Sequence, residues 1–306
     1  MIKAENLTKK FNGFRAVSSV SCEIPKGCIY GLIGSNGAGK STFLRLITGV
    51  YKADEGGITL DGEPVYENPV IKRKLAYVPD ELYFLANSSM KRMASLYSSI
   101  YADFDNARFM ELTELFKLNP KVNINTFSKG MRRQAATILA LCTNPEYIFF
   151  DETFDGLDPV VRNLVKNLIT QQVLDRGTTA IITSHSLREL EDTCDQLALL
   201  YQGGIVFESD VQNLKTSLFK IQVAFLDAYD QERFEGLDIL NFSKKGSVSN
   251  FIVRGDRERT KEFLETKSPV LLDILPLSLE EVFIYEMQAL GYAFENILEE
   301  DKDVQL

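Results

Sequence analysis

The sequence "GSNGAGKS" occupies residues Gly34–Ser41 and fits the pattern G-x-x-x-x-G-K-[ST]. It directly follows the apolar stretch "IYGLI" at Ile29–Ile33, which is typical of a buried strand. It directly precedes Thr42–Thr48, whose pattern predicts a helix that ends at Gly49. Glycines let backbone N–H groups turn inward around phosphate oxygens, and the start of a helix adds its positive end. This strand, loop and helix therefore predict a phosphate-binding loop in an α/β protein.

The residues of this loop have separate expected roles. Lys40 is expected to reach the β- and γ-phosphates, Ser41 to bind Mg²⁺, and Thr42 to support the α-phosphate side. The other positions expected to contact the nucleotide are Gly34, Ser35, Asn36, Gly37, Ala38 and Gly39. A glycine-rich turn without a ligand is the alternative, and the strand–loop–helix context disfavours it. The loop alone does not choose among kinases, GTPases, recombinases and transport ATPases.

Acidic residues follow a second apolar strand, in "YIFFDE" at Tyr147–Glu152. Asp151 and Glu152 therefore lie at the carboxyl end of a strand, where open α/β sheets bind ligands. Asp151 is expected to hold Mg²⁺ through water, and Glu152 to orient or deprotonate the attacking water. His185, the only histidine, follows the strand "TAIIT". A lone histidine is usually structural, but this position favours a contact with the γ-phosphate or the water.

The pattern of strands and helices changes along the chain. Strands and helices alternate over the first two-thirds, which predicts a mainly parallel sheet covered on both faces. Antiparallel strands are expected near the N-terminus, and "YQGGIVF" predicts a hairpin with Gly203-Gly204 as its turn. We expect one domain at 1–212, with a helical subdomain at about 88–142, and a small α+β domain at 213–306.

Composition excludes several classes of protein. The chain has 306 residues, 45% hydrophobic and 25% charged, which is typical of a globular protein. Its net charge of -9 disfavours nucleic acid as the main partner. The four scattered cysteines form no CxxC pair, which disfavours a disulfide framework or a zinc site. No signal peptide or membrane-spanning run is expected, so a membrane role would act through a partner.

The stretch "NTFSKGMRRQ", Asn125–Gln134, places charge on an unexpected helix end. Ser128 is predicted to cap a helix, and the positive end of a helix dipole favours acidic residues. The first turns instead carry Lys129 and two arginines, Arg132 and Arg133, which we expect to face solvent or acidic neighbours. Gly130 costs roughly 1 kcal/mol relative to alanine in a helix. These features indicate a helix end that approaches a negatively charged group.

Together the motifs resemble the nucleotide-binding subunit of an ABC transporter, over roughly residues 1–207. "GSNGAGKST" matches Walker A, "YIFFDE" matches Walker B, and His185 matches the switch histidine. "DGLD", Asp155–Asp158, matches the D-loop, and "FSKGM", Phe127–Met131, matches the signature sequence. Phe11 matches the aromatic residue that stacks on adenine, although a core aromatic on an edge strand is an equal alternative.

The resemblance implies a P-loop NTPase fold and a pair of ATPase domains that close head-to-tail over two ATP molecules. One chain would supply Lys40, Ser41, Asp151, Glu152 and His185 to each site. The other would supply Ser128 and Gly130, and Asp158 of the D-loop is also expected near the nucleotide. The expected partners are a second ATPase subunit, identical or paralogous, and a polytopic membrane permease that contacts the helical subdomain. The expected location is cytoplasmic, peripheral on the inner face of the cell membrane.

The sequence departs from the family pattern at a few positions. Asp80 stands where the Q-loop glutamine is usual, and its carboxylate is expected to ligate Mg²⁺, with Glu81 as an alternative. Thr153 replaces the proline that usually follows the Walker B glutamate. Lys129 and Met131 replace a glycine and a glutamine of the signature. This variant signature resembles bacterial ATPases of the drug and antimicrobial-peptide exporter type.

Two other functions stay open at this point. A soluble ABC ATPase that acts on ribosomes or DNA is disfavoured by the single phosphate loop, the short helical insert and the acidic charge. An importer ATPase with a regulatory C-terminal domain is the other alternative, because the α+β domain could serve that role.

Overall fold

The computed structural model describes residues 1–289 of the chain. Its contacts divide the chain into two compact units, Met1–Glu208 and Ser209–Leu306. The sequence placed this division after residue 212. The end of the expected C-terminal domain, 290–306, lies outside the described residues. The two units are described separately below.

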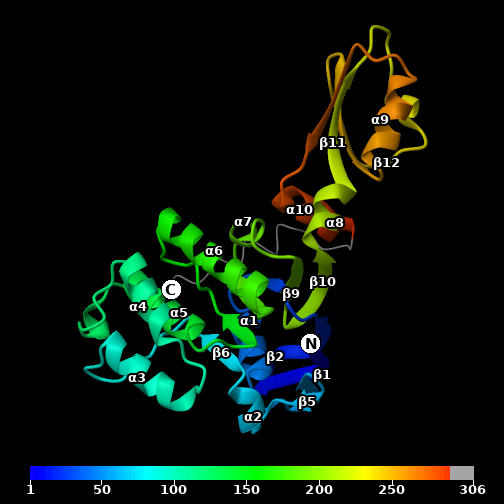
Figure 1. Ribbon diagram of the computed structural model, residues 1–306. Helices are drawn as coiled ribbons and strands as arrows, with labels where there is room; N and C mark the ends of the chain where they lie inside the picture. The colour runs from blue at the N-terminus through cyan, green and yellow to red at the C-terminus, as the bar shows by residue number, and fades with distance from the viewer. Residues whose placement is uncertain (290–306) are drawn as a thin grey trace, which may run out of the picture. The chain divides into compact units, whose positions relative to one another are not determined.

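A six-stranded sheet forms the centre of the first unit, in the order β10-β9-β3-β8-β7-β6 (Figure 1). Its strands are β3 (Ile29–Ile33), β6 (Leu75–Val78), β7 (Tyr147–Phe150), β8 (Thr179–Ser184), β9 (Gln196–Tyr201) and β10 (Gly204–Asp210). The pairs β3–β8, β3–β9, β6–β7 and β7–β8 are parallel. Every residue of β3, β7 and β8 is buried, which explains why apolar residues predominate in them. Because these strands are parallel, their carboxyl ends meet at one edge of the sheet.

Helices pack on this sheet and form the insert at its side. Helices α6 (Pro159–Arg176) and α7 (Leu187–Leu190) contact β8, and α1 (Lys40–Ile47) shares a core cluster with the sheet, whereas α2 (Pro69–Lys72) follows β5 in the chain. The insert consists of α3 (Met90–Ile100), α4 (Asn106–Leu115), a 3₁₀ turn (Ile124–Thr126) and α5 (Lys129–Leu141). The three helices contact one another, and α5 also contacts β6. The insert therefore joins the sheet through α5 (Figure 1).

A four-stranded antiparallel sheet precedes and follows the phosphate-binding loop in sequence. Its order is β2-β1-β4-β5, with β1 (Ile2–Phe11), β2 (Phe14–Ile24), β4 (Glu55–Leu60) and β5 (Glu63–Pro64). Its apolar side chains form one core cluster with residues of α1 and the parallel sheet. This packing confirms the expected combination of a parallel core sheet and antiparallel N-terminal strands.

The expected turn at Gly203-Gly204 was wrong by one residue. The turn uses Gln202 and Gly203, with φ of 47° and 80°, and β10 begins at Gly204. A two-residue type I′ turn needs positive φ at both positions, so Gln202 takes a left-handed conformation. Gly203 is fixed because its N–H donates to the carbonyl oxygen of Ala38 at 3.0 Å and its own carbonyl oxygen accepts from Ser18 at 2.8 Å.

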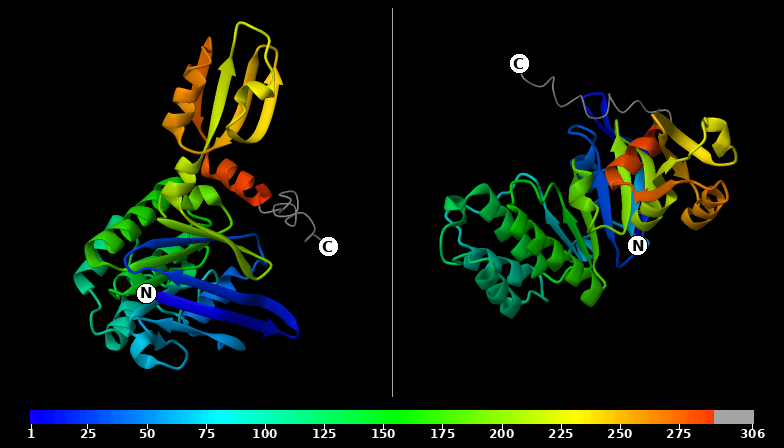
Figure 2. Two further views of the ribbon diagram at one scale, coloured as in Figure 1. Left: turned by 90° about the vertical axis from the view of Figure 1, so that its right-hand side faces the viewer. Right: turned by 90° about the horizontal axis from the view of Figure 1, so that it is seen from above.

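The second unit is a small α+β structure. Its antiparallel sheet has the order β12-β13-β11-β14, with β11 (Leu218–Ala224), β12 (Asp238–Lys245), β13 (Val248–Arg254) and β14 (Leu271–Pro276). Its helices are α8 (Val211–Ser217), α9 (Arg257–Glu265) and α10 (Leu279–Ala289), with a 3₁₀ turn at Gln231–Phe234. Helix α9 lies against one face of the sheet (Figure 2), and Leu264 joins a core rich in phenylalanine.

Candidate functional site

The phosphate-binding loop leads directly into α1. Gly39 precedes the helix with a φ of 106°, and a Cβ atom there would lie 2.3 Å from the carbonyl oxygen of Ala16. Only glycine fits this position, because it lacks a Cβ and adopts left-handed conformations easily. Helix α1 has no acidic residue in its first turn and no side-chain cap. Its first N–H groups are therefore suited to an anion.

Lys40 joins this loop to the end of β7. Its side chain is 5% exposed, and its Nζ donates to the carbonyl oxygens of Gly34 at 2.6 Å and Ser35 at 3.1 Å. The same Nζ lies 3.1 Å from Oε1 of Glu152. The buried ammonium thus has two neutral hydrogen-bond acceptors and a carboxylate beside it, which offset the cost of its burial.

Asp151 is fully buried and accepts hydrogen bonds from three hydroxyl groups. Ser41 donates to Oδ1 at 3.0 Å, Thr183 donates to Oδ1 at 2.8 Å, and Tyr77 donates to Oδ2 at 3.2 Å. Burial, and then the charge of Asp151, raise the pKa of Tyr77 well above its ordinary value, so the phenol remains a donor. Sequence reasoning missed Thr183 and Tyr77, because only the pairing of β6, β7 and β8 brings them to Asp151.

The hydroxyl of Ser41 and the carboxylate of Asp151 form a donor set that fits Mg²⁺. This ion binds proteins through one or two oxygen ligands and takes its remaining ligands from water and phosphates. Within residues 1–289, no group of three or more His, Cys, Asp and Glu side chains gathers as a metal site. The few protein oxygens at this position therefore suit a metal that arrives with phosphate groups.

Glu152 follows Asp151 in a left-handed conformation, with a φ of 47°. Such a conformation costs about 1–3 kcal/mol in a residue other than glycine. The N–H of Glu152 donates to Thr183 Oγ1 at 3.0 Å, and its Oε2 lies 3.0 Å from Nδ1 of His185. Together with Lys40, these contacts bring three expected catalytic side chains into one connected group at the edge of the sheet.

The signature sequence begins α5, as its pattern predicted. The Oγ of Ser128 accepts from the N–H of Met131 at 3.2 Å, which confirms its role as the helix cap. A Cβ atom at Gly130 would lie 3.0 Å from the carbonyl oxygen of Gly156, so the helix and the D-loop approach each other closely. Lys129 Nζ lies 2.7 Å from Oδ2 of Asp155, and this hydrogen bond lowers the pKa of Asp155. The helix start therefore has an acidic neighbour in its own chain.

Arg133 lies farther along the same helix and is 1% exposed. Its guanidinium donates to Asp80 Oδ1 at 2.8 Å and to the carbonyl oxygens of Asp151, at 3.4 Å, and Glu152. Arg133 was expected to face solvent or an acidic neighbour; the acidic neighbour is present, but the side chain is buried beneath the Walker B residues and does not face solvent. The structure thus connects Asp80 to the site through Arg133.

The remaining candidates lie on other elements. Phe11 ends β1, is 39% exposed, and packs edge-on against Tyr51 with ring centroids 5.5 Å apart. Its exposure argues against the alternative of a core aromatic. Asp158 caps α6, because its Oδ1 accepts from the N–H groups of Val160 and Val161 at 3.0 Å.

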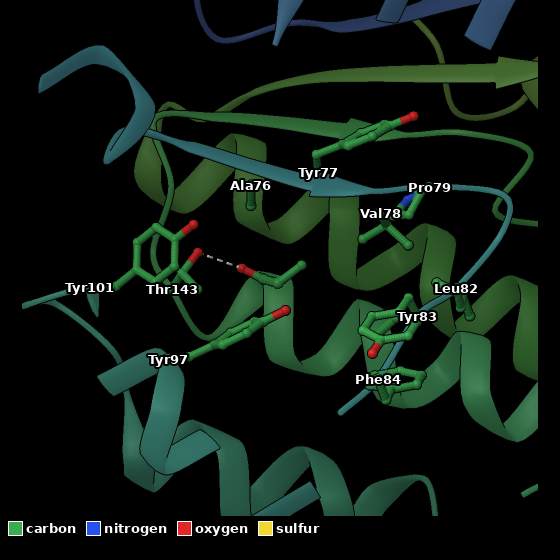
Figure 3. A pocket seen from close by; sticks show the side chains of 12 residues that line it. Ala76, Tyr77, Val78, Pro79, Leu82, Tyr83, Phe84, Tyr97, Tyr101 and Thr143 are labelled. Carbon is green, nitrogen blue, oxygen red and sulfur yellow. Dashed lines mark hydrogen bonds between the residues drawn. The ribbon is translucent and has the colours of Figure 1, made fainter. Parts of the chain in front are cut away.

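A small hollow of about 80 Å³ lies between the end of β6 and the helical insert. Figure 3 shows Tyr97 of α3 and Tyr101, just beyond the end of α3, on one side and Leu82, Tyr83 and Phe84 on the other. Thr143, beyond the end of α5, donates to the carbonyl oxygen of Ala140 at 2.8 Å beside the hollow. Residues 82–84, which follow Asp80 in the chain, therefore line an aromatic hollow beside the insert.

Comparison with known proteins agrees with this site. A family model described as "ABC transporter" matches residues 17–155, which hold both Walker motifs and the signature. The ABC transporter ATP-binding protein YtrB of Bacillus subtilis is 32% identical, over 93% of this chain and 97% of its own. The daunorubicin/doxorubicin resistance ATP-binding protein DrrA of Streptomyces peucetius is also 32% identical, over 71% of this chain and 67% of its own.

Solved structures support the fold. The structure described as an ATP-binding subunit of an ABC transporter has a TM-score of 0.65 and 23% identity. It covers 70% of this chain, and this chain covers 92% of it. The likeness confirms the predicted P-loop architecture. The chain belongs to the ABC transporter family, as an ATP-binding subunit.

Proposed function

We propose that this subunit binds ATP with Mg²⁺ and hydrolyses it to drive export through a separate membrane permease. One observation carries the proposal: Ser41 and Asp151 share a hydrogen bond next to the connected group of Lys40, Glu152 and His185. This arrangement places a metal-binding pair beside a base and a cation at the edge of the sheet. When bound there, Mg²⁺ would neutralise charge on the β- and γ-phosphates.

The contacts of Lys40 and Glu152 indicate how the chain's own residues would act. Phosphate oxygens would compete with Glu152 for the ammonium of Lys40, because they carry more negative charge. Glu152 would then accept a proton from the attacking water, and His185 would keep the carboxylate oriented through the 3.0 Å contact. The buried hydroxyl donors would hold Asp151 in place during this exchange.

A second ATPase subunit would complete each site. Ser128 and Gly130 lie at the positive end of α5, where the backbone approaches the D-loop closely. In a head-to-tail pair this helix end would face the γ-phosphate held by the other subunit. ATP and ADP differ in this contact, and the difference would supply the free energy for closing and opening.

The helical insert offers a surface for the permease. Tyr83, which lines the aromatic hollow, and Ile100, the last residue of α3, are exposed despite their large apolar side chains. Contiguous exposed apolar side chains often mark contact surfaces, whereas single exposed apolar residues are normal. No helix among residues 1–289 is long and apolar enough to cross a membrane. In this proposal the subunit lies on the inner face of the membrane, where it meets the permease, and the second unit is an accessory domain. The similarity to a drug-resistance ATP-binding protein favours export.

Glu152→Gln tests the proposed base. The variant keeps the size of the side chain but not its basicity, so turnover should fall by about 100-fold or more. ATP binding should remain, and the variant should accumulate as a dimer in ATP, measured by size-exclusion chromatography with light scattering. Glu146→Gln, at the exposed start of the same strand, is the matched control. Near-normal turnover of Glu152→Gln would remove this residue from the base role.

Ser128→Arg tests the second subunit's contribution in the same assays. The monomer should bind ATP as before, since the Walker residues are unchanged. Dimer formation and hydrolysis should both be lost, because a bulky cation replaces the cap at the proposed interface. Loss of nucleotide binding by the monomer would contradict a role in the partner's site.

A further inference from the structure

Arg133 is among the largest side chains that are fully buried in the described part of the chain. A cation in this environment must be compensated by nearby acceptors, because its loss of hydration is costly. Its acceptors are one carboxylate, from Asp80, and two carbonyl oxygens, from Asp151 and Glu152. The planar guanidinium can satisfy all three because its N–H groups form a rigid fork.

These contacts hold the backbone of Glu152 from one side. From the other side, Thr183 Oγ1 accepts the N–H of Glu152 at 3.0 Å. The backbone carbonyl oxygen and N–H of Glu152 are therefore both hydrogen-bonded, and these bonds hold its backbone in the left-handed conformation. The held backbone directs the carboxylate toward Lys40 and His185. The position of the proposed base thus depends on an arginine from the signature helix.

Asp80 occupies the remaining side of the guanidinium. Its side chain is 47% exposed, whereas Arg133 is almost completely buried, so the pair spans the surface and the interior. A metal ion at Asp80 would compete with this guanidinium for the same carboxylate charge and weaken the compensation of a buried cation. The geometry therefore favours an ion pair over the metal ligation expected from the position of Asp80 in sequence.

We propose that Arg133 is a positioning residue for Glu152, and that Asp80 is its counter-ion rather than a Mg²⁺ ligand. The proposal rests on the proposed role of Glu152 as the base. It links the start of α5 to the Walker B residues of the same chain through one side chain. It also explains why the helix tolerates a third basic residue near its positive end.

Arg133→Lys is the first variant. Lysine keeps the charge but presents a single ammonium, which cannot reproduce the fork to Asp80 and both carbonyl oxygens. We expect kcat to fall by at least about tenfold, because small misplacements of a catalytic group are costly. The affinity for a fluorescent ATP analogue, measured without turnover, should stay within about twofold. Arg132→Lys makes the same change at the next, partly exposed residue of α5 and should keep both values.

Asp80→Asn is the second variant; its amide oxygen can still accept a hydrogen bond from Arg133, and a denaturation curve measures the stability lost with the charge and checks that the variant folds. The Mg²⁺ concentration at half-saturation, followed by fluorescence of the bound analogue, should not change. The kcat should fall less than in Arg133→Lys, and the double variant should resemble Arg133→Lys alone, because both act through one contact.

Three results would overturn the proposal. They are a Mg²⁺ midpoint raised about fivefold or more in Asp80→Asn, a normal kcat in Arg133→Lys, and independent effects that multiply in the double variant. If Arg133→Lys fails to fold, the Mg²⁺ midpoint and kcat of Asp80→Asn still decide. A wild-type chain without ATPase activity would instead contradict the proposed function, so the two failures are distinguishable.

Discussion

The carboxyl end of β7 and the loops beside α5 hold their carboxylates in different ways. At β7, Asp151 is buried and accepts from the hydroxyls of Ser41, Thr183 and Tyr77. Beside α5, Asp80 and Asp155 face cations from the signature helix. Neutral donors leave the full negative charge of a carboxylate available to a metal ion, whereas a guanidinium or ammonium already balances it. Nearness to the sheet edge therefore does not by itself identify a metal ligand.

Asp151→Asn should give the largest effect, because it removes a buried carboxylate charge that hydroxyl donors, rather than a cation, hold in place. The amide can still accept hydrogen bonds, so the fold should remain. We expect Mg²⁺-dependent ATP hydrolysis to fall by about 100-fold or more. A Mg²⁺ titration of turnover measures this, with Asp273→Asn on an exposed strand of the second unit as control. An unchanged titration would remove the distinction between the two regions.

Tyr77→Phe should have a smaller effect in the same region. The substitution keeps the ring but removes one of three donors to Asp151. The free energy of unfolding should fall by about 1 kcal/mol, the typical contribution of one hydrogen bond. Chemical denaturation measures the free energy of unfolding of this variant. Tyr97→Phe is the control, because Tyr97 lines the aromatic hollow in the same unit. Equal changes in both variants would show that the phenol does not support Asp151.

Lys129→Met should have the smallest effect and tests the region beside α5. The hydrogen bond from Lys129 lowers the pKa of Asp155, so the ionised pair stabilises the folded state at neutral pH. This contribution is complete above the ordinary aspartate pKa of about 3.9 and is lost as pH falls through the lower pKa of the folded state.

Because both side chains are largely exposed, the difference in unfolding free energy between wild type and Lys129→Met should stay below about 1 kcal/mol at pH 7. Denaturation curves should show this difference shrinking as the pH is lowered below about 4. Lys121→Met, at an exposed position of the same insert, should show no such dependence. A difference that grows at low pH would contradict the assignment of the ion pair.

Sequence patterns were sufficient for the elements that depend on local chemistry. The phosphate-binding loop, the buried strands β7 and β8, and the cap Ser128 were all predicted from neighbouring residues. The β9–β10 turn was misplaced because its position depends on hydrogen bonds from Gly203 to distant parts of the chain. Local propensity carries no information about such contacts.

The sequence by itself determined the family, the parallel sheet and the group of residues expected at its edge. The sheet was inferred from periodicity, which is a property of short segments, whereas the family and part of the site were inferred from the resemblance of the motifs. Tertiary structure alone decided that Tyr77 and Thr183 hold Asp151, and that Arg133 reaches both Asp80 and the backbone of Glu152. The physical reason is that strand pairing and helix packing choose the partners of a buried polar group from segments far apart in the chain.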